Sequence, residues 1–209
     1  MYDQIYWALT HGDTVHYNPV TLRPEMKNYT IFVDGISKSL AATGVRVGWS
    51  MGPKKIIAKM KSILTHVGAW APKAEQLATA VYLNDLSKYD TFISEINYKI
   101  NERLQGFHKG FQSLKNDGYR VDSIAPEAAI YLTVQFKLHG QTTAEGKILE
   151  TTQDVTKYIL DEGKVAIVPF YAFGASPDSS WYRLSVGTCK VEDVEAVIEN
   201  LRIALKKIK

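Results

Sequence analysis

A long helical pattern in the middle of the chain constrains the fold most. From Asp90 onward, apolar residues recur at steps of three and four, and the pattern stops at Asn116-Asp117-Gly118, where Gly118 suits a C-cap. We therefore expect two domains, residues 1–89 and 90–209, with the long helix connecting them. The apolar positions of the helix are Phe92, Ile93, Ile96, Ile100, Leu104, Phe107, Phe111 and Leu114.

The patterns on either side of this helix predict a mixture of helices and strands. Before it, β-branched and aromatic runs predict strands at residues 29–33 and 45–49, and Pro53 and Pro72 each precede a helical pattern. After it, the patterns predict a compact α+β lobe of the kind αββαββα. Its expected elements are strands at 129–136, 165–168 and 181–186 and helices at 152–161 and from about 192.

The composition excludes several classes of protein. The chain has 209 residues, of which 45% are hydrophobic and 22% charged, as is ordinary for a soluble globular protein. Its one cysteine, Cys189, excludes a disulfide framework, and the five histidines have no metal-ligand spacing. The net charge of +3 is weak and the lysines are scattered, so we expect no nucleic-acid partner. No apolar run approaches the ~20 residues that span a bilayer, and no signal peptide is visible, so we expect no membrane partner.

One segment carries the richest chemistry. Residues 35–49 read GISKSLAATGVRVGW, so that a lysine follows a strand in a loop of small residues. Small residues leave room for a bound planar group, and a partly desolvated lysine amine is a nucleophile toward an aldehyde. Arg46 offers a planar fork that suits a phosphate. Taken singly, Lys38 fits a solvated loop lysine and Arg46 a surface strand residue far more often, but the whole string is more specific.

This string resembles the Schiff-base lysine motif of fold-type I pyridoxal-phosphate enzymes, in particular class I aminotransferases. Their pattern is Ser-Lys, a spacer and then Gly-x-Arg-x-Gly-Trp. The resemblance implies that Lys38 binds pyridoxal 5'-phosphate (PLP) covalently and that Ser37 and Arg46 bind its phosphate. The family often has a second serine where this chain has Gly35, which implies one fewer phosphate hydrogen bond. The matching positions are Ser37, Lys38, Gly44, Arg46, Gly48 and Trp49.

Two further segments agree with this resemblance. Asp3-Gln4-Ile5-Tyr6 is similar to the family's Asp-x-x-Tyr, which implies that Asp3 pairs with the pyridine nitrogen and that Tyr6 bonds the ring's phenolic oxygen. A carboxylate there keeps the ring charged, so that the ring accepts electrons from the substrate. Residues 181–187 resemble the strand whose arginine grips the substrate α-carboxylate, which implies that role for Arg183. Taken alone, Asp3 and Tyr6 would suit an N-terminal turn, and Arg183 would suit an exposed strand.

The resemblance covers nearly the whole chain but only the second half of such an enzyme. It implies an α/β fold. Residues 1–89 are then the C-terminal portion of the PLP-binding large domain, a mixed sheet with helices, and residues 90–209 are the connecting helix and an α+β small domain. We expect an aminotransferase acting between an amino acid and a 2-oxo acid, cytoplasmic and homodimeric as a full-length enzyme. We expect this chain to be a fragment of it that is inactive alone.

Two alternatives stay open. A β-lyase or decarboxylase of the same fold would use the same electron sink. A non-catalytic remnant module would keep the fold without turnover. An absorbance shift of bound PLP on adding an amino acid would separate a catalytic protein from an inert one.

Overall fold

The computed structural model describes residues 1–209 and divides into two compact units, Met1–Asn97 and Tyr98–Lys209. The division lies inside the predicted long helix, α5, which is confirmed and spans Leu86–Asn116. It begins before Asp90 because the carboxylate of Asp85 accepts a hydrogen bond from Lys88 N at 3.2 Å, as an N-cap does. Gly118 has a left-handed backbone, with φ at 91°, and closes the helix as expected.

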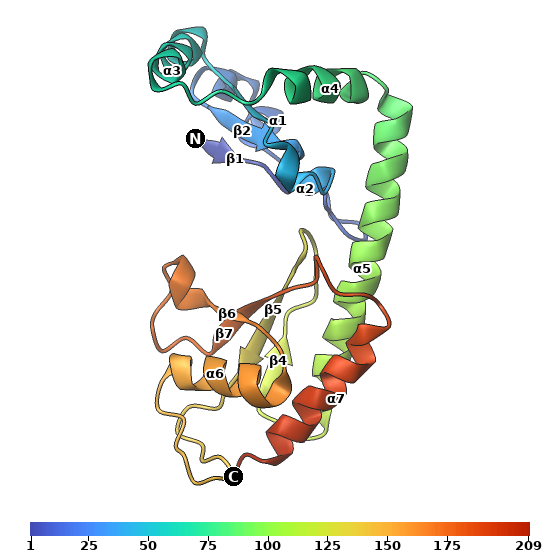
Figure 1. The fold of residues 1–209 in the computed structure, drawn as a ribbon, viewed down its shortest axis with the longest axis vertical. Helices are drawn as coiled ribbons and strands as arrows, with labels where there is room; N and C mark the ends of the chain where they lie inside the picture. Colours follow the sequence, from blue (N-terminus) through green and yellow to red (C-terminus); the bar gives the residue numbers. More distant parts are fainter. The chain divides into compact units, whose positions relative to one another are not determined.

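The first unit holds a three-stranded mixed sheet. Its strands are β1 (Tyr2–Asp3), β2 (Phe32–Gly35) and β3 (Gly48–Met51), in the order β1-β2-β3. Strand β1 runs parallel to β2, whereas β3 runs antiparallel to it (Figure 1). The mixed sheet with accompanying helices agrees with the fold expected for this part of the chain.

Two predicted strands begin too early in the sequence. The strand expected at residues 29–33 begins at Phe32, because Tyr29 closes a 3-10 turn by donating to Met26 O at 3.0 Å. The strand expected at residues 45–49 begins at Gly48, because the left-handed backbone of Arg46 cannot continue a strand. Runs of β-branched and aromatic residues therefore indicate that a strand is near, but they do not fix the residue at which it begins.

The helices after β3 agree with the sequence patterns. Both Pro53 and Pro72 stand at the N-cap of a helix, where a missing backbone N–H costs nothing. Gly68 ends the first of them in a left-handed conformation and donates to Leu64 O at 2.9 Å. Two single-turn helices were not predicted. The helices of this unit before α5 are α1 (Pro19–Leu22), α2 (Ile36–Ser39), α3 (Lys54–Val67) and α4 (Lys73–Leu83).

The second unit is an antiparallel sheet with helices, in the expected order αββαββα. The strand order is β4-β5-β7-β6. Helices α6 and α7 lie side by side (Figure 1), and the buried Tyr158 hydroxyl of α6 donates to Ala204 O of α7 at 2.8 Å. The expected order includes a strand at the place of β4, but no residue range was predicted for it. The elements after α5 are β4 (Val121–Ser123), β5 (Tyr131–Phe136), α6 (Thr152–Gly163), β6 (Val168–Pro169), β7 (Trp181–Ser185) and α7 (Asp193–Lys206).

Aromatic rings fill the centre of the second unit. Phe136 packs edge-on against Phe111 and Tyr182, with ring centroids 5.6 Å and 5.8 Å apart, and all three residues are buried. Such pairs add about 0.5–1.5 kcal/mol to the burial itself. Burial also raises the pKa of the Tyr182 phenol. None of the helices combines the length and apolar character needed to cross a membrane.

The start of α6 predicts a measurable dependence of stability on pH. Asp154 accepts from Lys147 Nζ at 2.6 Å and from Thr151 in a capping box, and these bonds lower its pKa from 3.8 to about 2. A lowered pKa contributes stability that is present above 3.8 and is lost as the pH falls through about 2. We therefore expect Asp154→Asn to lower the melting temperature at neutral pH, and the gap from wild type to close over that acid window.

Thermal unfolding followed by circular dichroism would measure this gap. Asp178→Asn is the matched control, because Asp178 is exposed in the same unit and its carboxylate makes no hydrogen bond or ion pair. A gap between wild type and Asp154→Asn that stayed constant down to about pH 2 would contradict the role of the carboxylate.

Candidate functional site

The predicted residues of the first unit lie where two parallel strands end. Strand β1 ends at Asp3 and β2 at Gly35, in a register that pairs Asp3 with Val33. Because parallel strands end at the same edge of a sheet, the segments that follow them are neighbours. Exposed Asp3 accepts from Ile5 N at 3.1 Å, which bends the chain toward Tyr6 immediately after the strand.

Lys38 and Tyr6 meet at this edge. Lys38 lies in α2, directly after β2, and its Nζ is 6.0 Å from the centroid of the Tyr6 ring. Both residues are half-buried, so that the amine has one side against protein and one toward solvent. A nucleophilic lysine needs this kind of position, because it must be reached by a ligand and yet held in place.

Arg46 lies in a strained turn. It follows the 3-10 turn Thr43–Val45, which contacts α2, and has a left-handed backbone with φ at 61°. Its Nη1 donates to Thr43 O at 2.7 Å, while the side chain is exposed. Ala41 also has a positive φ, of 49°. Two such non-glycine residues between Lys38 and β3 each cost energy, and strain of this kind clusters at ligand sites.

Gly35 and Gly48 bring β2 and β3 unusually close beside the lysine turn. The two glycines pair across the strands, and a Cβ added to either would lie 2.9 Å from a backbone oxygen of the other strand. Gly35 stands where the family often has serine, and the structure gives a reason for the departure. A side chain at this position would collide with Val47 O.

Gly35→Ala is expected to lower the free energy of unfolding by about 1–3 kcal/mol, the usual cost of overpacking. The added Cβ would lie 2.9 Å from Val47 O and 3.0 Å from Gly48 Cα, and these backbone atoms cannot rotate away. Denaturant unfolding measures the change. Gly44→Ala is the control, because no atom lies within 4 Å of a Cβ there, and it should shift stability by less than about 0.5 kcal/mol. Equal losses in both variants would argue against the close approach.

In the second unit, Arg183 lies over two aromatic rings. It occupies the middle of β7, between Thr133 of β5 and Val168 of β6. Its Cζ is 4.2 Å from the centroid of the Tyr131 ring and 4.3 Å from that of Phe173. Stacking on rings restrains the guanidinium plane and leaves its N–H edge available for a planar carboxylate.

The sequence reading missed the residues that support these side chains. Tyr131 pairs with Ser185, so it is a diagonal neighbour of Arg183 on the sheet, and this contact follows only once the register of β5 and β7 is known. Phe173 reaches Arg183 through the 3-10 turn Phe170–Phe173. Buried Asp34 was also missed, although a charged residue at the end of a buried strand was the available signal.

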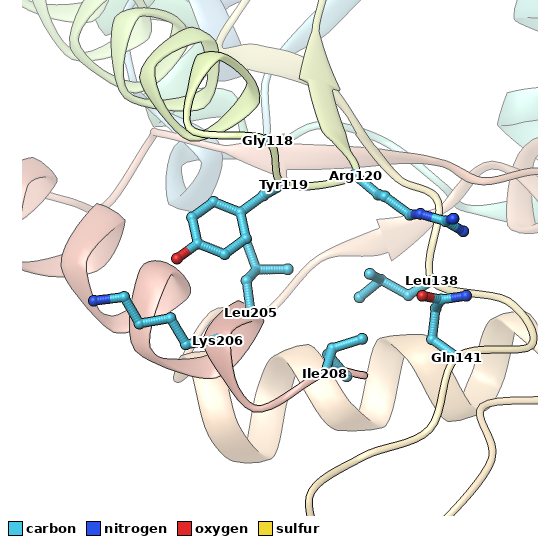
Figure 2. Close-up of a pocket in the computed structure, with 8 residues that line it drawn as sticks. All are labelled: Gly118, Tyr119, Arg120, Leu138, Gln141, Leu205, Lys206 and Ile208. Atoms are coloured by element: carbon cyan, nitrogen blue, oxygen red, sulfur yellow. The ribbon is translucent and has the colours of Figure 1, made fainter.

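A separate hollow in the second unit contains none of the predicted site residues. It measures about 400 Å³. Figure 2 shows Lys206 and the Tyr119 ring on one side of it and Arg120 with Gln141 on the other. The two cationic side chains therefore do not converge on a single point, and we assign no ligand to this hollow. Its lining is Gly118, Tyr119, Arg120, Leu138, Gln141, Leu205, Lys206 and Ile208.

Comparison with known proteins identifies the family of the chain. Residues 1–201 match the family described as aminotransferase class I and II. The chain belongs to this family. Enzymes of the aminotransferase class I and II family depend on PLP.

Relatives in sequence are named as aminotransferases. The chain is 29% identical to an aspartate aminotransferase of Rhizobium meliloti over 199 residues, which are 93% of this chain and 45% of the relative. It is 32% identical to a probable aspartate/prephenate aminotransferase of Rickettsia felis, covering 95% of this chain and 46% of the relative. The chain thus spans about half the length of the curated relatives it matches.

Solved structures give the same picture for the fold. The aspartate aminotransferase of Rhizobium meliloti superposes with a TM-score of 0.84 at 28% identity, over 98% of this chain and 49% of that one. An aromatic aminotransferase from Pyrococcus horikoshii superposes with a TM-score of 0.81 at 26% identity, over 98% and 50%. The predicted fold, part of an aminotransferase large domain followed by an α+β unit, is confirmed.

Proposed function

We propose that this chain forms part of a PLP-dependent aminotransferase that moves an amino group between an amino acid and a 2-oxo acid, with Lys38 as the covalent cofactor ligand. The observation that carries the proposal is the meeting of Lys38 and Tyr6, with Nζ 6.0 Å from the ring centroid, at the shared end of β1 and β2. Family membership supports PLP as the cofactor, and this geometry supports its attachment at Lys38.

The charges of the first unit fit PLP. Asp3 and Arg46 are both exposed, and neither takes part in any ion pair of the chain. An unpaired carboxylate suits a protonated pyridine nitrogen, and an unpaired guanidinium suits a phosphate. Arg46 donates one N–H to Thr43 O, and the other N–H donors of its guanidinium are available for a ligand. Ser37, beside Lys38, adds a hydroxyl donor.

Each residue then has one task. When bound, PLP supplies the electron sink that stabilises negative charge at the substrate α-carbon. Asp3 would pair with the protonated ring nitrogen, and the Tyr6 hydroxyl would donate to the ring's phenolic oxygen. Lys38 Nζ would hold the cofactor covalently and, when free, would carry the proton removed from the substrate α-carbon. Arg183 orients the substrate by holding its α-carboxylate with two parallel hydrogen bonds.

The names of the relatives point to the first substrate to test. Several of them are called aspartate or aspartate/prephenate aminotransferases. Aspartate with a 2-oxo acid acceptor is therefore the first pair to assay. We also propose, on the family resemblance alone, that the whole protein is a cytoplasmic homodimer, which sedimentation and cell fractionation would test.

Absorbance spectroscopy tests the proposed function. Adding PLP to the protein should produce the visible band of the lysine-bound cofactor. In the full-length enzyme, adding aspartate should then convert this band to that of the amine form, with release of the matching 2-oxo acid. Release of carbon dioxide or loss of the β-substituent instead would identify a decarboxylase or a β-lyase of the same fold. No change of the PLP spectrum on mixing would refute cofactor binding.

A further inference from the structure

Asp34 is a buried carboxylate beside the lysine turn that none of the roles above uses. It is 7% exposed and stands at the end of β2, one residue before Gly35. None of the ion pairs of the chain includes it. Burying an unpaired carboxylate costs free energy unless hydrogen bonds compensate for the lost hydration. The hydrogen bonds of Asp34 therefore indicate what its charge holds in place.

Three neutral donors surround this carboxylate. Its Oδ2 accepts from Trp7 Nε1 at 2.9 Å and from Gln4 Nε2 at 3.2 Å. Its Oδ1 accepts from Gly35 N at 2.7 Å. The charge of Asp34 also acts on Tyr89. The pKa of the Tyr89 phenol is raised mainly by burial and, second, by Asp34. Every contact is a donor facing an oxygen, so the site matches a carboxylate and no other common side chain of that size.

These donors belong to the two segments that meet at the candidate site. Gln4 and Trp7 stand on either side of Tyr6 in the turn after β1, while Gly35 N opens the turn that carries Lys38. One carboxylate therefore bonds both the tyrosine segment and the lysine segment. Removing it would leave the buried Gly35 N unsatisfied and would free the two segments to move separately.

We propose that Asp34, with Trp7 as its nearest side-chain donor, is a positioning residue that holds Tyr6 and Lys38 in register for the cofactor. This inference rests on the proposed function, since register matters only if both residues act on one ligand. Attachment joins Lys38 Nζ to the aldehyde carbon of PLP and releases one water molecule. Its rate depends on where Nζ lies relative to the ring that Tyr6 contacts, and a displacement of about 1 Å can cost a hundredfold.

Two variants remove the link. Asp34→Asn keeps the shape but offers an amide NH₂, so at least one of the three donors would face another donor. Trp7→Phe keeps an aromatic ring but deletes the Nε1 donor together with part of the indole. Trp70→Phe is the matched control, because Trp70 is exposed in the same unit and its indole makes no hydrogen bond. Both test variants should slow PLP attachment at Lys38 by about tenfold to a hundredfold, while the control should not.

Two readouts separate positioning from general stability. The indole N–H resonance of Trp7, assigned by its loss in Trp7→Phe, should shift in Asp34→Asn, and the absorbance maximum of the attached cofactor should move in both variants. A lower unfolding free energy with an unchanged attachment rate and absorbance maximum would reduce Asp34 to a structural residue and overturn the inference. Failure of the wild-type protein to attach PLP at Lys38 would instead overturn the proposed function, and the inference with it.

Discussion

Lys38→Ala is expected to abolish covalent attachment of PLP to this protein. Lys38 is the lysine that follows β2 directly and has its Nζ beside the Tyr6 ring, at 6.0 Å. Its half-buried position, with the exposed carboxylate of Asp3 and guanidinium of Arg46, would give the proposed cofactor several contacts at once. Contacts that fix orientation raise the rate of a covalent step far above that of a free amine in solution.

Borohydride reduction followed by peptide mapping measures this attachment. With PLP at a stoichiometric amount, the reduced label should lie on Lys38 in the wild type and should fall to background in Lys38→Ala. Lys27→Ala is the matched control, because Lys27 is an exposed lysine of the same unit, and it should keep the full label. A label that moved to another lysine without loss of yield would mean that Lys38 is one reactive amine among many.

The helices were predictable because their signals are local. The apolar spacing of α5, the prolines before α3 and α4 and the left-handed glycines after α3 and α5 all act within a few residues. The strands of the first unit were placed less well. Whether Tyr29 or Val45 joins a sheet depends on the turns to which they belong, and their β propensity does not reveal these turns. Tyr29 closes the 3-10 turn before β2, and Val45 precedes the left-handed backbone of Arg46.

The candidate site divides in the same way. Lys38 and Arg46 stand in one contiguous motif, so that the sequence alone marks them. Asp34 bonds Gln4 and Trp7 across about thirty residues of chain, and Arg183 lies over Tyr131 and Phe173 through strand pairing and a separate turn. Contacts of this kind depend on sheet register, which a sequence pattern does not contain. A sequence motif thus identifies the residues expected to bind a ligand more readily than the residues that orient them.

In the full-length enzyme, Arg183→Lys is expected to lower kcat/KM for an amino acid by about one to three powers of ten. The substitution keeps the positive charge but loses the fork that makes two parallel hydrogen bonds to a carboxylate. Lysine also gives up the planar contact with the rings of Tyr131 and Phe173, now 4.2 Å and 4.3 Å from Cζ. Losses of about 1.5–4 kcal/mol in charged hydrogen bonding correspond to this range of rates.

Steady-state assays of amino transfer give kcat/KM, and calorimetric titration of wild type and variant with a 2-oxo acid gives the affinity for the carboxylate. Both kcat/KM and the affinity for the 2-oxo acid should fall, since binding of the carboxylate contributes to each. Arg120→Lys is the matched control, because Arg120 is exposed in the same unit and takes part in no ion pair. If Arg183→Lys bound and turned over the amino acid as the wild type does, the α-carboxylate would have to be held by another residue, and the stacked rings would serve only the fold of the sheet.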